Sequence, residues 1–94
     1  MFKKSSDDFN SQTERNLKGK ELEKNGDIEK AIELYELNVR SEFPGNFPYD
    51  CLAIIYRKKK NYDEEIRVLQ KAIEVFVGER IKRNRGTQRI EGRL

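Results

Sequence analysis

The amino-acid sequence repeats itself at an offset of about 34 residues. Small and apolar residues of the first half are followed, about 34 positions later, by residues that continue the same helical pattern. The corresponding pairs are Gly19 with Ala53, Leu22 with Tyr56, Ile28 with Tyr62, Ile32 with Ile66, Tyr35 with Leu69, and Val39 with Ile73. A period of about 34 residues is the length of one helix–turn–helix unit of a stacked solenoid. The spacing therefore predicts an all-α fold of two stacked helix–turn–helix repeats, an α-solenoid fragment.

Turn-forming residues divide the chain into four expected helices. Gly26 can take the left-handed conformation that ends a helix, and Gly78 is expected to do the same. Pro44 and Gly45 favour a turn at the centre of the chain. Residues 11–14, Ser-Gln-Thr-Glu, fit a capping box at the start of the first helix. The helices are expected at residues 11–25, 28–41, 47–59 and 63–77, with a hinge between Pro44 and Pro48.

The same signals predict three segments. Residues 1–10 are polar and are expected to form a flexible arm. Residues 11–78 are expected to form the helical domain, with its repeats at 12–45 and 46–79. Residues 79–94 contain few apolar side chains and are expected to form a basic tail or a short capping helix.

Apolar residues recur at spacings of three and four within the expected helices, which gathers them on one face of each helix. These faces are expected to meet in the core of the stack. The residues expected to be buried there are Leu22, Ile32, Tyr35, Leu52, Tyr56, Ile66, Leu69 and Ile73.

Composition excludes several kinds of chemistry. The chain contains no histidine and one cysteine, Cys51. Histidine-based catalysis, histidine metal sites and an internal disulfide are therefore excluded. We expect no catalytic residues, no metal and no cofactor. A single unpaired cysteine fits a reducing compartment, so a cytoplasmic location is expected. No apolar run reaches the roughly 20 residues that a membrane-spanning helix needs, so no membrane partner is expected.

Charge is distributed unevenly along the chain. Residues 80–94 contain six basic residues and one acidic residue, a net charge of +5. Because the whole chain carries +3, residues 1–79 carry −2. The basic segment could neutralise phosphates in a salt-dependent and sequence-independent way. It has no aromatic residue on which a base could stack, which makes nucleic acid the less favoured partner.

The residues at the repeated positions resemble the tetratricopeptide repeat. The resemblance covers about residues 12–45 and 46–79. It rests on Gly19, Leu22, Gly26, Ala31 and Tyr35 in the first copy and on Tyr49, Leu52, Ala53, Tyr56, Tyr62 and Ala72 in the second. One departure has a structural consequence. Glu65 occupies the position of Ala31, and an unpaired buried carboxylate is costly, so Glu65 is expected to reach solvent or a cation.

The resemblance implies that the first helix of each repeat lines a concave, partner-binding face. The residues expected to bind a partner there are Asn16, Lys20, Phe47, Asp50, Ile54, Arg57 and Lys58. Phe47 and Ile54 would form an apolar anchor, and Arg57 and Lys58 would hold a carboxylate. In the alternative interpretation, Phe47 folds over the turn between Pro44 and Pro48, and Ile54 is a scattered surface residue.

Two functions remain open at this level. The first is a non-enzymatic adaptor that binds a peptide or protein through the concave face. The second is a nucleic-acid accessory protein that uses the basic segment. Two repeats also leave one end of the stack open, where Leu69, Ile73 and Phe76 would be poorly covered. This predicts a weak homodimer or a fold that depends on a partner.

Overall fold

The computed structural model describes residues 8–91, with side chains as far as Ile81. It contains four α-helices: α1 (Phe9–Lys24), α2 (Ile28–Arg40), α3 (Phe47–Lys58) and α4 (Tyr62–Glu91). The predicted all-α fold of two helix–turn–helix units is confirmed. Most of the expected flexible arm, residues 1–7, lies outside the described part of the chain, and so does the segment 92–94.

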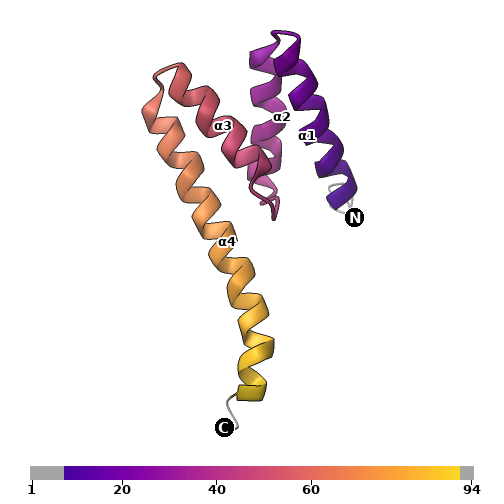
Figure 1. Cartoon of the computed structure of the whole chain (residues 1–94), viewed down its shortest axis with the longest axis vertical. Coiled ribbons are helices and arrows are strands. Elements are labelled where there is room, and N and C mark those ends of the chain that lie inside the picture. The colour runs from indigo at the N-terminus through magenta and orange to yellow at the C-terminus, as the bar shows by residue number, and fades with distance from the viewer. Residues whose placement is uncertain (1–7, 92–94) are drawn as a thin grey trace.

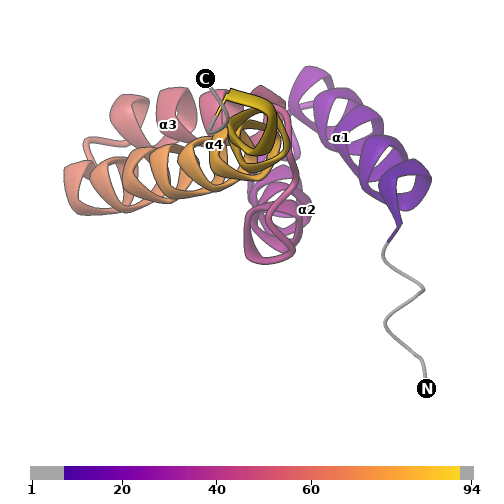
Figure 2. The ribbon, with the colours of Figure 1, turned by 90° about the horizontal axis from the view of Figure 1, so that it is seen from below.

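Helix α2 lies at the centre of the arrangement. It packs against α1 on one side and against α3 and, to a smaller extent, α4 on the other (Figure 1). Helix α3 lies along α4, and a view along the stack shows α1 on the opposite side of α2 from this second hairpin (Figure 2). The two hairpin turns lie at the same end of the stack, and α4 extends well beyond the other three helices at the opposite end (Figure 1).

The beginning of α1 differs from the sequence prediction. The capping residue is Asp8, whose carboxylate accepts a hydrogen bond of 2.8 Å from the backbone N–H of Ser11. The predicted capping box with Ser11 as the cap is therefore wrong. An aspartate three residues earlier satisfies a free N–H group at the helix start equally well and adds about two residues to the helix.

The end of α4 also differs. Gly78 lies inside this helix, which continues to Glu91, so the prediction that Gly78 ends the helix is wrong. A glycine inside a helix costs about 1 kcal/mol relative to alanine, but it does not by itself stop the helix. Good helix formers such as Glu79 and Arg80 follow directly and allow the helix to continue. The basic side chains from Lys82 onward lie outside the described part, so a role for them stays a prediction.

Three helices are each followed by a residue in the left-handed backbone conformation. Gly26, Glu42 and Lys60 follow the caps of α1, α2 and α3 with φ values of 88°, 58° and 61°. At the end of α3 the N–H of Asn61 donates to the carbonyl of Tyr56, and the N–H of Lys60 donates to that of Arg57. The equivalent pairs of bonds close α1 and α2, so all three ends are Schellman motifs. Gly26 and Lys60 are 34 positions apart, so they occupy equivalent positions of the two repeats. The left-handed conformation favours glycine, and only position 26 has it.

Lys60→Gly should therefore stabilise the protein. A left-handed conformation costs a residue with a Cβ about 1–2 kcal/mol, so we expect the free energy of unfolding to rise by roughly 1 kcal/mol. Gly26→Ala should lower it by a similar amount. Urea denaturation monitored by circular dichroism measures both changes. Lys30→Gly, inside α2, is the matched control and should destabilise; a destabilised Lys60→Gly variant would contradict the assigned turn.

The core lies between the hairpins and is centred on α2 and α3. Of the predicted core residues, Tyr35, Leu52 and Tyr56 are buried, and Leu22 and Ile32 are partly buried. The prediction is wrong for α4, where Ile66, Leu69 and Ile73 are exposed. The face of α4 that packs against the rest of the fold instead carries Glu65, Val68, Ala72 and Val75.

The repeat itself explains this error. Ile66, Leu69 and Ile73 correspond to Ile32, Tyr35 and Val39 of α2, a face that α3 covers. Within the described residues no further helix follows α4 to cover the same face. The sequence register is thus consistent with the structure, but none of the described helices takes the position that would bury those side chains.

Leucine-to-alanine substitutions at two positions should distinguish the buried core from the exposed outer face of α4. Leu52 is fully buried, so Leu52→Ala should cost about 2–5 kcal/mol of unfolding free energy. Leu69 is 37 % exposed, and Leu69→Ala should cost about 1 kcal/mol or less in dilute solution. Thermal and urea denaturation provide both values. Equal losses at the two sites would show that the outer face of α4 is buried in solution.

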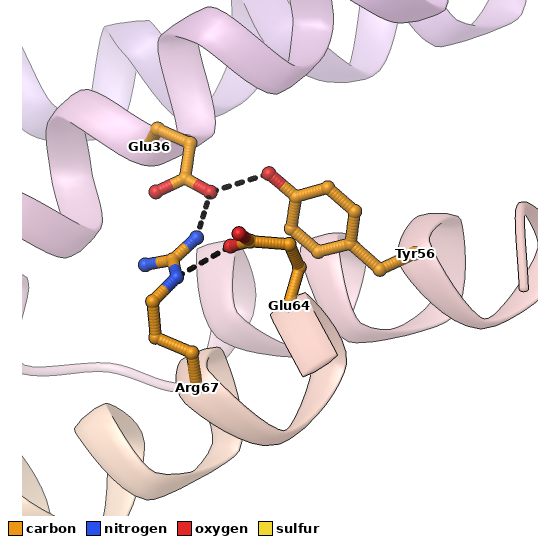
Figure 3. Close-up of polar contacts among 4 residues, drawn as sticks. All are labelled: Glu36, Tyr56, Glu64 and Arg67. Atoms are coloured by element: carbon orange, nitrogen blue, oxygen red, sulfur yellow. Dashed lines mark hydrogen bonds and ion pairs between the residues drawn. The ribbon is translucent and has the colours of Figure 1, made fainter. Parts of the chain in front are cut away.

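A polar cluster connects the two repeats (Figure 3). Glu36 of α2 accepts hydrogen bonds from the hydroxyl of Tyr56 on α3 and from the guanidinium of Arg67 on α4. The same guanidinium also donates to Glu64 at 2.5 Å. One carboxylate thus joins three helices and adds polar contacts between the second hairpin and the first.

Candidate functional site

The first helices of the two hairpins, α1 and α3, are linked through Tyr35 of α2, which is fully buried. Its hydroxyl donates to Glu23 of α1, and its ring meets Phe47 of α3. Lys20 and Glu23 of α1 lie close enough to Cys51 of α3 for their charges to act on the thiol. Phe47, Ile54 and Lys58 extend this side of α3 in both directions. We refer to the surface formed by Lys20, Glu23, Phe47, Ile54 and Lys58 as the α1–α3 groove.

At the turn end of the groove lies a pocket of about 260 Å³. Its apolar wall consists of isoleucine side chains, and its rim is charged. The residues that line it are Glu23, Ile28, Ile54, Ile55, Lys58 and Lys59. Ile54 is 52 % exposed, so much of the apolar wall is accessible from solvent. We call this the Ile54 pocket. It can take an aliphatic side chain, with a charged group of the ligand at its rim.

Phe47 occupies the other end of the groove. Its ring lies edge-on to the ring of Tyr35, with centroids 6.1 Å apart, and 37 % of the residue is exposed. Phe47 therefore contacts α2. One side of the ring supports the fold, and the rest borders the groove.

Three of the predicted partner-binding residues have partners inside the fold. Asn16 is buried in the α1–α2 interface, where its side-chain oxygen accepts a hydrogen bond of 2.7 Å from Asn38. Asp50 accepts one of 2.7 Å from the Asn46 side chain at the start of α3. The structure does not bring Asn16 to the groove, and it keeps Asp50 in a local helix-start contact.

Arg57 also has an internal partner. Its guanidinium lies 2.7–2.8 Å from the carboxylate of Glu65, which is 8 % exposed. The expectation that Glu65 reaches a cation is confirmed. Because Arg57 neutralises a buried charge, it is less available for a ligand carboxylate than Lys58, which is exposed beside it.

Burial raises the pKa values of two groups between α1 and α3, the Tyr35 hydroxyl and the Cys51 thiol. Burial, together with a hydrogen bond of 2.6 Å that the hydroxyl donates to Glu23, raises the pKa of Tyr35 far above its ordinary value. Burial also raises the pKa of the Cys51 thiol. A thiol with a raised pKa stays protonated at neutral pH and is a poor nucleophile. Neither the Tyr35 hydroxyl nor the Cys51 thiol is therefore activated at neutral pH.

The sequence prediction missed Ile28, Ile55 and Lys59 of the Ile54 pocket. Ile28 begins α2 directly after the first turn, and Lys59 caps α3 directly before the second. The repeat places both turns at one end of the stack (Figure 1), so the residues beside them come together. The offset of about 34 residues predicts that the two turns lie at the same end of the stack. It could therefore have pointed to Ile28 and Lys59, which lie beside the turns, but not to Ile55.

The comparison with known families agrees with this architecture. The tetratricopeptide repeat matches residues 15–38 and 52–76, one segment in each hairpin. The chain therefore belongs to the tetratricopeptide repeat family and carries two repeats. Such repeats are generally protein–protein interaction modules, and the family is typically non-enzymatic. No curated protein and no solved structure was found to match the chain.

No group of three or more Cys, Asp or Glu side chains among the described residues could hold a metal ion. None of the helices in that part of the chain is both long enough and apolar enough to cross a membrane.

Alkaline pH should destabilise the protein because its three buried tyrosines resist ionisation. Burial is the main cause that raises the pKa values of Tyr35, Tyr49 and Tyr56, and for Tyr49 the value reaches about 12. Above pH ~10 the unfolded chain releases these protons while the folded chain keeps them. The free energy of unfolding should therefore fall with rising pH, by up to about 1.4 kcal/mol per pH unit for each tyrosine.

Urea denaturation at several pH values between neutral and strongly alkaline measures this slope. Tyr56→Phe should remove its share of the slope, whereas Tyr62→Phe, at an exposed position, should leave it unchanged. A stability that does not change through pH ~11 would contradict the burial of these hydroxyls.

Proposed function

We propose that the chain is an interaction adaptor that binds a segment of a partner protein in the α1–α3 groove. The Ile54 pocket is the observation that carries this proposal. It joins an accessible apolar wall to a charged rim that carries Lys58 and Lys59 as well as Glu23. Membership of a family of protein-interaction repeats supports the same function.

The chemistry of the pocket indicates the kind of segment that fits. An aliphatic side chain of the partner would contact Ile28, Ile54 and Ile55, and burying it would contribute about 1.5–3 kcal/mol. An acidic group next to it would lie near Lys58, which is exposed, whereas the neighbouring Lys59 pairs with Glu29 at 2.8 Å. Such exposed charges contribute about 0–1 kcal/mol each and less at high salt. The proposed partner is thus a peptide segment with an aliphatic anchor and a neighbouring acidic residue.

This function requires no catalysis. Cys51, whose thiol pKa is raised by burial, supports a binding role over a nucleophilic one. A single free cysteine also supports placing the protein in a reducing compartment such as the cytoplasm.

A library of displayed peptides, selected on the intact chain, would identify the bound sequence. Ile54→Ala should then weaken binding of a selected peptide by about 10-fold, because it removes apolar contact worth roughly 1.4 kcal/mol. Lys58→Glu should weaken binding of acidic peptides and reduce its salt dependence. Leu37→Ala, at an exposed residue of α2, is the matched control and should change neither property.

The test can also contradict the proposal. Ile54 and Lys58 are exposed, so both variants should keep the melting temperature of the parent chain. Arg57→Glu is a poor probe because it places a second carboxylate against buried Glu65. If the two groove variants bind as the parent does, and removal of residues 79–94 abolishes binding, the basic segment is the functional part.

A further inference from the structure

The outer face of α4 carries a continuous apolar stripe. Its six residues are separated by three or four positions, so they line one side of the helix. They are Tyr62, Ile66, Leu69, Ile73, Val77 and Ile81, which we call the α4 stripe, and their exposed fractions lie between 37 % and 61 %. From first to last the stripe is about 28 Å long at 1.5 Å per residue.

The repeat shows that this face is of a kind that packs against a helix. Ile66, Leu69 and Ile73 occupy the positions that Ile32, Tyr35 and Val39 occupy in α2. In α2, Tyr35 and Val39 are buried in the core and Ile32 is partly buried against it, and α3 packs against this helix. The α4 stripe extends the same face further along the helix and has no cover within the described residues.

The rest of the described surface offers no second apolar strip to match it. The other exposed large apolar residues are scattered singly or in pairs over three helices: Phe9, Leu17, Leu37, Phe47 and Ile54. Helix α1, which would take the covering position if copies stacked end to end, presents Glu14, Lys18 and Glu21 to solvent. Among the described surfaces, the one that best complements the α4 stripe is therefore the α4 stripe of a second copy.

We propose that two copies of the chain associate through their α4 stripes in an antiparallel arrangement. With the two-fold axis between Leu69 and Ile73, the stripe of one copy pairs with the stripe of the other. Tyr62 of one copy then meets Ile81 of the second, and Ile66 meets Val77. The same register places Asp63 of one copy beside Arg80 of the other, and both residues are exposed. A parallel arrangement would instead place Asp63 beside Asp63 and Arg80 beside Arg80, and like charges repel each other.

This dimer is independent of the α1–α3 groove, since the stripe lies on α4 and shares no residue with the groove. The stripe residues keep 37–61 % of their surface exposed, whereas Val68, Ala72 and Val75 are the residues of α4 that are buried in the fold. Six partly exposed side chains form a small interface, so association should be weak and concentration-dependent. A substitution can therefore abolish peptide binding in the groove without affecting dimerisation, and the reverse.

Sedimentation velocity of the full chain over a wide concentration range tests the association. We expect a monomer–dimer equilibrium, and Ile73→Glu should weaken it by at least 100-fold because it places two carboxylates near the axis. Ile54→Glu, at a residue of similar exposure in the groove, is the matched control and should leave the equilibrium unchanged. Melting of dilute Ile73→Glu should match the parent, since residue 73 is 61 % exposed.

Cysteine cross-linking tests the orientation. In a Cys51→Ala background, a mixture of Ile66→Cys and Val77→Cys chains should form a disulfide between the two variants under mild oxidation. Ile66→Cys alone should remain unlinked. Three results would overturn the proposal: a strict monomer at about 1 mM, an Ile73→Glu chain that dimerises as the parent does, or preferential linking of residue 66 to itself.

Discussion

The packing of the Tyr35 ring against Gly19 holds the stack together. A Cβ at position 19 would lie 2.6 Å from the Tyr35 ring, closer than any side chain tolerates. Tyr35 is fully buried and cannot move aside. Its ring also meets Phe47 of α3, and its hydroxyl donates to Glu23 of α1. One side chain of α2 thus sets the distance to α1 and contacts α3, and the groove between those two helices depends on it.

A buried amide completes the interface between α1 and α2. Asn38 is fully buried and donates hydrogen bonds to the carbonyl of Gln12 and to the side chain of Asn16. Its oxygen accepts one from Arg15. Every polar group of this side chain is satisfied, so its burial does not carry the cost of an unpaired amide. The polar sequence of α1 is therefore compatible with close packing, because directional bonds replace much of the apolar contact that joins α3 to α4.

The two proposed surfaces arise from one property of a stacked repeat. Each hairpin has a groove side, formed by its first helix, and an outer side on its second helix that receives the next hairpin. In the first hairpin that outer side is α2, which α3 covers, and the first helices α1 and α3 are left to border the groove. In the second hairpin the outer side is α4, which ends the described stack. Binding of a peptide and association of two copies would thus use opposite sides of the same unit.

The sequence alone determined the number of helices, the position of the turns and the need of Glu65 for a cation. These features follow from local periodicity, turn residues and the cost of an unpaired charge, which act within one helix or one turn. Tertiary structure decided the rest. Whether Ile66, Leu69 and Ile73 are buried depends on a neighbouring helix, and the residue that pairs with Glu65 depends on how α3 crosses α4. Periodicity identifies the apolar face of a helix, but only the presence of another helix can take that face out of water.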